Sequence, residues 1–227
     1  MIIDLDLTPP TTSTGLRFPR LAPASLVAGP LILVIAEILH PHLPGTTSVE
    51  LAHELLGHIG RWQAWSVVLL IGAVVAVPGV LRLFRVVGGG RGRIPTTVGI
   101  VMTICAAVGA GGFAVMNSQL AGMAAAGPID DAVAAAITRA ENDPSSAICL
   151  LLFLVGMHVG WPVLIGGAAR AGLAKHWQWI LVVVGSLSVY ALSSVSQWFE
   201  PLGLLIVAAA VAPTEIHLLR GQHVARD

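Results

Sequence analysis

Charged residues, aromatic residues and cysteine are all scarce in this sequence. Asp, Glu, Lys and Arg make up 11% of the 227 residues, whereas a soluble domain carries about a quarter. The formal net charge is +0, so the chain lacks the basic surface that phosphate backbones require, which argues against a nucleic-acid partner. The only cysteines, Cys105 and Cys149, lie in apolar runs without a CxxC spacing. They are typical of small buried side chains rather than of a disulfide or redox pair.

Several functional signatures are also missing. The sequence has no glycine-rich nucleotide loop and no serine-hydrolase motif, which argues against phosphoryl transfer and serine hydrolysis. The first 20 residues have no basic segment before a short apolar core, so they do not resemble a cleavable signal. We expect residues 1–20 to be a disordered cytoplasmic tail, residues 21–220 to be the membrane domain, and residues 221–227 to be a second cytoplasmic tail.

Long apolar runs, in contrast, are abundant. Hydrophobic residues make up 56% of the chain and the mean hydropathy is +0.85. A helix needs about 20 apolar residues to cross a bilayer. The windows that meet this requirement are, approximately, 22–40, 62–84, 96–122, 146–168, 177–197 and 201–218. The sequence thus predicts an all-α membrane protein, a bundle of six transmembrane helices with short loops. A five-span alternative has one long helix broken at Glu200-Pro201.

The basic residues divide between the two sides of this six-span arrangement. Ten of the 12 Lys and Arg residues fall on one side, and Arg61 and Arg139 fall on the other. Because cytoplasmic loops carry the excess of Lys and Arg, we predict a multi-pass protein of the cell membrane with both termini in the cytoplasm.

Two outer loops contain helix signals of their own. Thr47-Ser48-Val49-Glu50 fits a capping box, which opens a short helix ending near Gly57. Pro128, followed by two aspartates, opens a second helix that ends at Asn142-Asp143-Pro144. We expect two short helices on the outer surface of the membrane.

A line of polar side chains runs along the fifth window. Ser186, Tyr190, Ser193, Gln197 and Glu200 are spaced so that a helix over about 178–200 would carry them on one face. A polar side chain in hydrocarbon is costly unless it faces protein or water, so this face should point into the bundle.

The ends of the odd-numbered windows suggest a pocket open to the outside. Glu37, Asn117 and Glu200 lie at matching predicted depths, and the alanines before Asn117 should let a neighbouring helix approach closely. Glu37 and Glu200 are also candidate catalytic acids, although both would be solvated and ionised if they lie in the headgroup layer. The predicted ligand-binding residues are Glu37, Asn117, His158, Tyr190, Gln197 and Glu200.

His158 lies near the middle of the fourth window, where Pro162 leaves its carbonyl without a helix partner. It either lines the pocket, with or without a proton-relay role, or hydrogen-bonds to a neighbouring helix as a packing residue. Gly156 and Gly160 form a GxxxG pair on another face of this window, through which two chains could associate.

The first outer loop contains His40, His42, His53 and His58. His53 and His58 are five residues apart, which fails the HExxH spacing of zinc proteases. We therefore predict a hydrated loop and no metal site. Glu50 and His53, spaced i, i+3, are the alternative ligands of an outward zinc or copper ion.

Residues Gly57-His58-Ile59-Gly60-Arg61-Trp62, followed by an apolar run to Pro78 and Arg82, resemble a pattern in small uncharacterised integral-membrane proteins of high-GC bacteria. The resemblance covers about a third of the chain. It implies a membrane location and no particular activity.

Three functions are compatible with these features, and none of them specifies a cofactor. The first is binding or transport of a small or amphiphilic molecule in the outward-facing pocket. The second is a lipid- or isoprenoid-modifying enzyme of the acid-catalysed cyclase type, with Trp161, Tyr190 and Trp198 facing the cation, although the low aromatic content weighs against it. The third is a non-catalytic accessory subunit whose polar groups only hold helices together.

Overall fold

The structure of the protein, a computed structural model, describes residues 24–43, 47–88, 90–192 and 195–224. These residues are mostly helical and contain no strand, which confirms the predicted all-α fold. The expected tail over 1–20 lies outside the described residues, whereas part of the expected C-terminal tail is helical up to Val224. In chain order the helices are α1 (Ser25–Leu39), α2 (Ser48–Leu55), α3 (Ile59–Val87), α4 (Arg93–Ala125), α5 (Asp131–Glu141), α6 (Pro144–Val155), the π-helical turn η1 (Gly156–Gly160), α7 (Trp161–Arg170), α8 (His176–Ala191) and α9 (Phe199–Val224).

Four helices are long and apolar enough to cross a membrane: α3, α4, the continuous α6–η1–α7 helix, and α9. α1 and α8 are apolar too, but have only 15 and 16 residues. Large apolar side chains cover the outer faces of the helices, as with Val108 and Leu187, which are 63% and 61% exposed. Water would disfavour such a surface and hydrocarbon would not. The helices therefore indicate a membrane-embedded protein.

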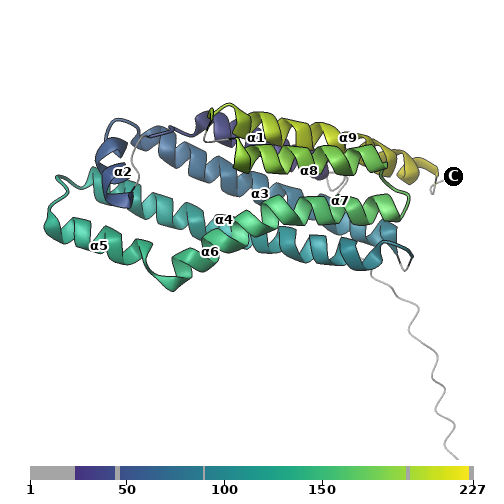
Figure 1. Cartoon of the computed structure of the whole chain (residues 1–227), viewed down its shortest axis with the longest axis horizontal. Coiled ribbons are helices and arrows are strands. Elements are labelled where there is room, and N and C mark those ends of the chain that lie inside the picture. Colours follow the sequence, from purple (N-terminus) through teal and green to yellow (C-terminus); the bar gives the residue numbers. More distant parts are fainter. Residues whose placement is uncertain (1–23, 44–46, 89, 193–194, 225–227) are drawn as a thin grey trace, which may run out of the picture.

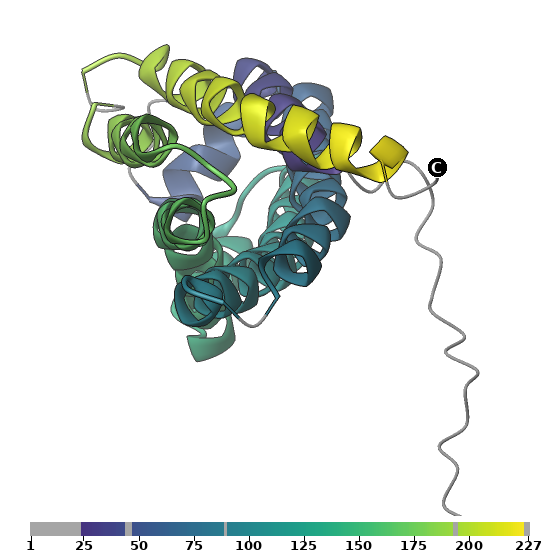
Figure 2. The same cartoon turned by 90° about the vertical axis from the view of Figure 1, so that its right-hand side faces the viewer.

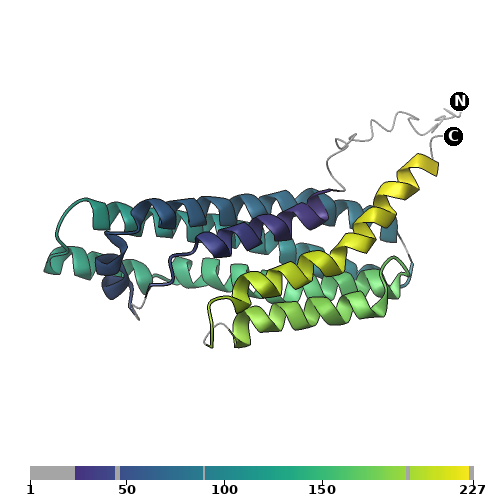
Figure 3. The same ribbon diagram turned by 90° about the horizontal axis from the view of Figure 1, so that it is seen from above.

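The long helices pack in a ring, which is visible when the molecule is viewed along its length (Figure 2). α1 lies between α9 and α3, α3 packs on α4, α4 packs on α6–η1–α7, and α7 and α8 close the ring beside α9. α2 and α5 lie together at one end, which we call the α2–α5 end (Figure 1). The α3–α4 and α7–α8 connections and the C-terminal part of α9 lie at the opposite end (Figure 3).

Small residues on α4 allow close packing inside this ring. Ala106, Ala110 and Ala114 are all buried, which confirms the predicted packing face. Gly156 and Gly160 face α4 of the same chain, and a Cβ on Gly156 would lie 2.3 Å from the carbonyl oxygen of Met102. This glycine face is therefore in contact with α4 of the same chain.

The predicted helix over 178–200 is wrong, because α8 ends at Ala191 and α9 begins at Phe199. Pro201 lies in the first turn of α9, where a proline fits because its missing N–H would have no helix partner. α8 and α9 are instead an antiparallel pair (Figure 3). A Cβ on Gly185 would lie 2.6 Å from the carbonyl oxygen of Gly203. This pairing excludes the alternative of one broken long helix.

Both short helices of the α2–α5 end start at the predicted caps. Thr47 Oγ1 accepts a hydrogen bond from the Glu50 N–H (3.2 Å), and Glu50 Oε2 accepts one from the Thr47 N–H (3.0 Å), which confirms the capping box. Asp130 caps α5 by accepting from the Val133 N–H (2.9 Å).

Candidate functional site

A polar cluster lies at the α2–α5 end, where α1 ends and α9 begins. α1 stops at Leu39 because His40 precedes Pro41, and a residue before proline disfavours the helical conformation. His40 accordingly has φ −57° and ψ 120°. Glu37 lies three residues before His40, and Glu200 lies in the first turn of α9, where the helix dipole favours an acidic side chain. Residues far apart in the sequence therefore meet at the two helix ends.

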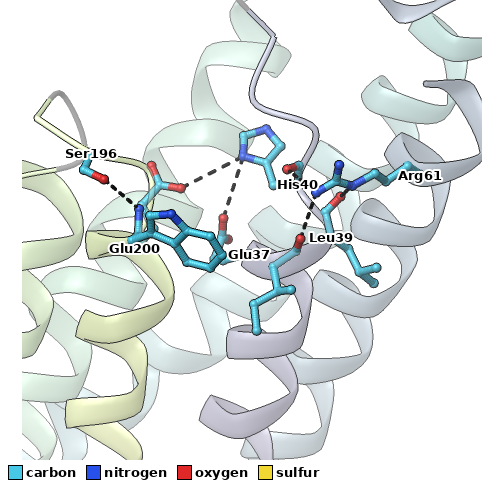
Figure 4. Close-up of polar contacts among 8 residues, drawn as sticks. Glu37, Leu39, His40, Arg61, Ser196 and Glu200 are labelled. Carbon is cyan, nitrogen blue, oxygen red and sulfur yellow. Dashed lines mark hydrogen bonds and ion pairs between the residues drawn. The ribbon is translucent and has the colours of Figure 1, made fainter. Parts of the chain in front are cut away.

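Two carboxyl groups face the His40 ring in this cluster (Figure 4). His40 Nδ1 lies 3.8 Å from Glu37 Oε2 and 4.0 Å from Glu200 Oε2. Both carboxyl groups therefore approach the same ring nitrogen. All three side chains are mostly buried. The structure thus brings together the two acids that the sequence placed at one depth.

Arg61, at the start of α3, is beside this cluster but binds backbone rather than the acids. Its Nε donates to the Leu39 carbonyl (2.9 Å), and its Nη2 donates to the carbonyls of Ile38 (3.0 Å) and His40 (3.4 Å) (Figure 4). These carbonyls belong to the last turn of α1 and have no partner within the helix. Among the described residues, neither Glu37 nor Glu200 forms an ion pair with a lysine or arginine.

Aromatic rings fix the position of His40. Its ring stacks on Trp65, with centroids 4.1 Å apart and an interplanar angle of 19°. Trp62 lies on another side at 5.8 Å, and the His42 ring lies at 4.5 Å. The His40 side chain therefore has little freedom to turn away from the two carboxyl groups.

A separate groove of about 800 Å³ lies between α4, α5 and α6 at the same end of the molecule. Its lining on α4 includes glycine and apolar residues such as Gly111, Phe113 and Met116. Asn117, which is only 5% exposed, lines it as well, and its Nδ2 has no hydrogen-bond partner among the described residues. Trp62 connects the groove to the polar cluster, since its Nε1 donates to the Asn117 carbonyl (3.2 Å).

The mouth of the groove is polar and acidic. It is lined by Glu141, Asp143, Ser145 and Ser146 at the α5–α6 connection. The hydroxyl of Ser145 and its backbone N–H both donate to Asp143, and these hydrogen bonds lower the pKa of the Asp143 carboxyl. Asp143 therefore stays ionised throughout the neutral pH range.

His158 lies elsewhere, within the ring of helices. Its Nδ1 donates to the carbonyl of Ser186 on α8 (3.2 Å), which confirms the interpretation as a residue that hydrogen-bonds to a neighbouring helix. Pro162 follows the π-helical turn that contains His158. The cavity lined by His158 and Trp161 measures about 10 Å³, which is about the space that one water molecule needs.

The remaining predicted site residues do not join either arrangement in the described part of the chain. Gln197 is exposed in the turn before α9. The side chain of Tyr190 and the whole of Ser193 lie outside the described residues. Glu50 closes the capping box of α2, and His53 is exposed on the same helix.

Three features were not predicted from the sequence. The first is the proximity of His40 and His42 to Glu200. The His-Pro-His spacing indicated that the two histidines are close together, but the packing of α1 on α9 could not be read from local sequence. The groove depends on how α5 sits beside α4. Glu215 is 5% exposed in α9, and its buried Oε1 has no hydrogen-bond partner among the described residues. In the sequence, the position of Glu215 inside an apolar window could have indicated a buried acid.

Fold, surface and polar sites together define a helical membrane-embedded protein. No known protein family, no curated protein and no solved structure matches this chain. Its own geometry is therefore the basis for a functional assignment.

Proposed function

We propose that this chain is a six-span protein of the cell membrane that binds or transports an amphiphilic molecule, with the binding site in the groove between α4, α5 and α6. The short helices α1 and α8 are apolar and belong to the same ring as the four long ones. In this proposal they also cross the membrane, with the bilayer locally adapted to their length. α2 and α5 lie on the outer surface.

The distribution of basic residues supports this orientation. The end opposite α2 and α5 carries the connections with Arg91 and Lys175, together with the basic ends of α3 and α7. By the positive-inside rule, this excess of Lys and Arg supports a cytoplasmic location for that end and for both termini. In a chain with both native cysteines replaced by alanine, an impermeant maleimide should label Ala135→Cys on intact cells but not Gly90→Cys. The reverse pattern would refute the orientation.

One observation carries the proposed binding function: the Asn117 amide in the groove. A buried donor without a partner costs about 1–3 kcal/mol, and a helix packed only for stability has no reason to place it there. Asn117 lines a groove of about 800 Å³, which is within the usual range of about 300–1,000 Å³ for ligand sites, and its Nδ2 is buried in the groove wall without a partner among the described residues. A ligand with a hydrogen-bond acceptor would satisfy this donor.

The lining of the groove specifies the chemistry of that ligand. The apolar lining near Gly111 and Phe113 suits an acyl chain, and the Asn117 amide suits an ester or amide carbonyl. The acidic mouth, with Glu141 and the ionised Asp143, repels phosphate and carboxylate head groups. We therefore expect an acyl amphiphile with an uncharged or cationic head group.

A photoreactive monoacylglycerol, with a diazirine in its acyl chain, tests this proposal. The full chain in phosphatidylcholine nanodiscs should be labelled mainly in residues 111–123 and 145–150. Asn117→Leu removes an unpartnered donor, so it should fold normally and reduce this labelling about fivefold, which corresponds to one hydrogen bond of about 1 kcal/mol. Ser118→Leu, an exposed neighbour outside the groove, is the matched control and should leave labelling unchanged.

The contradicting results are equally specific. Labelling spread evenly over the lipid-facing surfaces of α3, α4 and α8 would show that the groove has no preference for the probe. Identical labelling of wild type and Asn117→Leu would show that the Asn117 amide does not bind the probe.

The accessory-subunit function is the second candidate, because several buried polar groups do join helices. Gln178 Nε2 on α8 donates to the Ala210 carbonyl (2.7 Å) and to Thr214 Oγ1 (3.0 Å) on α9. Arg82 Nη2 on α3 donates to the Leu218 carbonyl (2.7 Å). The cyclase alternative has no comparable support, since Trp161 is buried beside the 10 Å³ cavity and Trp198 is 64% exposed.

A further inference from the structure

The cluster at the junction of α1 and α9 has the composition of a transition-metal site, and it is separate from the groove. His40, His42 and Glu200 each offer one ligand atom, and these atoms all lie within 4.8 Å of one another. Two imidazoles and one carboxylate are a common ligand set for zinc in proteins. We propose that His40, His42 and Glu200 bind a zinc ion.

The distances fit a site that closes around a small cation. Ligand atoms about 2.0–2.1 Å from a tetrahedral zinc are about 3.4 Å apart. His40 Nδ1 lies 4.0 Å from Glu200 Oε2, which is too long for a hydrogen bond and slightly wider than this spacing. A small rotation of either side chain therefore brings both atoms to zinc-binding distance.

His40 provides an independent indication of a ligand. Its Nδ1 is buried and has no hydrogen-bond partner among the described residues. Trp65 holds the ring in place, and Arg61 holds the backbone carbonyl of the same residue. A fixed, buried nitrogen that points between two carboxyl groups, as Figure 4 shows, is a prepared metal ligand.

Charge balance supports the same conclusion. Facing carboxylates such as Glu37 and Glu200 repel each other unless a proton or a cation lies between them. In the part of the chain that the structure describes, no lysine or arginine pairs with either of them. A zinc ion carries the two positive charges that would neutralise both. Glu37, whose Oε2 lies 3.8 Å from the same His40 Nδ1, would then help to orient the ligands, as carboxylate neighbours of metal ligands commonly do.

The local backbone brings the two histidines together. His40 and His42 flank Pro41, and side chains two residues apart in an extended segment point to the same side. Glu50 and His53 were the alternative metal ligands in the sequence. Those residues lie on α2, and Glu50 is engaged in the capping box. They make a useful contrast within the same histidine-rich region.

Zinc binding to the full chain in detergent tests the proposal, with protein purified on a tag that contains no histidine. After removal of metal with EDTA, titration against a chromophoric zinc chelator should show one site per chain. His42→Gln and Glu200→Gln should each weaken binding at least tenfold, whereas His53→Gln with His58→Gln should not change it. Zinc should also raise the thermal unfolding temperature of the wild type, but not that of His42→Gln.

Cobalt replaces zinc as a spectroscopic probe, and the wild type should show absorption bands that are lost in His42→Gln. His42 lies outside the helices, so this variant should keep the fold, and Glu200→Asp provides a second variant that keeps a carboxylate. Absence of a zinc site in the wild type would overturn the proposal. Full binding by both His42→Gln and Glu200→Gln, or loss of binding in His53→Gln with His58→Gln, would overturn it too. None of these measurements uses the amphiphile probe, so this proposal and the proposed function can fail separately.

Discussion

Arg61 shows how a single exposed charge can organise the α2–α5 end. Its guanidinium donates to three consecutive carbonyls of the last turn of α1 and the residue after it. These carbonyls would otherwise lack partners at the membrane surface. Arg61 therefore joins α3 to α1 and fixes the backbone that carries Glu37 and His40.

Arg61→Met should lower the free energy of unfolding by about 1 kcal/mol, because exposed hydrogen bonds of this kind contribute about that much. Thermal unfolding in detergent measures the change. Arg139→Met is the matched control, since Arg139 Nε bonds only the Ala135 carbonyl of its own helix (3.3 Å), and it should change stability by less than about 0.5 kcal/mol. Equal effects of the two substitutions would contradict the role of Arg61.

The sequence predicted which residues are polar site residues better than it predicted which residues they contact. Glu37, Asn117 and Glu200 were expected near one depth, and the structure places Glu37 and Glu200 beside His40 but Asn117 in the groove. The depth of a residue along a helix follows from counting residues. The direction in which its side chain points depends on which helices are neighbours in the ring. That information comes from packing between distant segments, so it was absent from the local pattern.

Some helix pairs pack with their backbones very close together. α8 and α9 approach each other at Gly185 and Gly203, where a Cβ on either residue would lie 2.6 Å from the carbonyl oxygen of the other. Lipid offers no hydrophobic drive between helices, so close packing of small residues is important for their association. The hairpin formed by these helices also sets the position of Glu200 at the start of α9.

Gly185→Ala should destabilise the protein by about 1–3 kcal/mol, because the added methyl group forces two backbones apart. Gly122→Ala is the matched control on α4, where a Cβ meets nothing within 4 Å. It should stabilise the helix by about 0.5–1 kcal/mol. Chemical unfolding in detergent compares the two. A tolerated Gly185→Ala would show that α8 and α9 are not in close contact there.

The start of a helix was predictable where a nearby side chain caps it. The capping box at Thr47 and the cap at Asp130 were both confirmed, because each requires only residues three positions apart. The end of α8 was not predicted, because the apolar pattern continues past Ala191 and no glycine or proline occurs between Ala191 and Pro201. An amphipathic pattern indicates which residues share a helix face only while the helix continues.

At the scale of the whole molecule, the helices form one ring with two different ends. The α2–α5 end carries the polar cluster and the mouth of the groove, and the opposite end carries most of the basic residues. Trp62 lies between the cluster and the groove and contacts both. Ligand binding in the groove and metal binding at the helix junction are therefore both placed at the surface proposed to face outward.

Native mass spectrometry of the full chain with added monoacylglycerol tests whether the groove binds one amphiphile. We expect the wild type to retain one molecule of this probe per chain after the detergent is removed. Ala147→Trp fills the groove and should lose the bound molecule, whereas Val108→Trp, on the exposed face of α4, should retain it. A wild-type chain without bound probe, or an Ala147→Trp chain that still carries it, would contradict the proposed function.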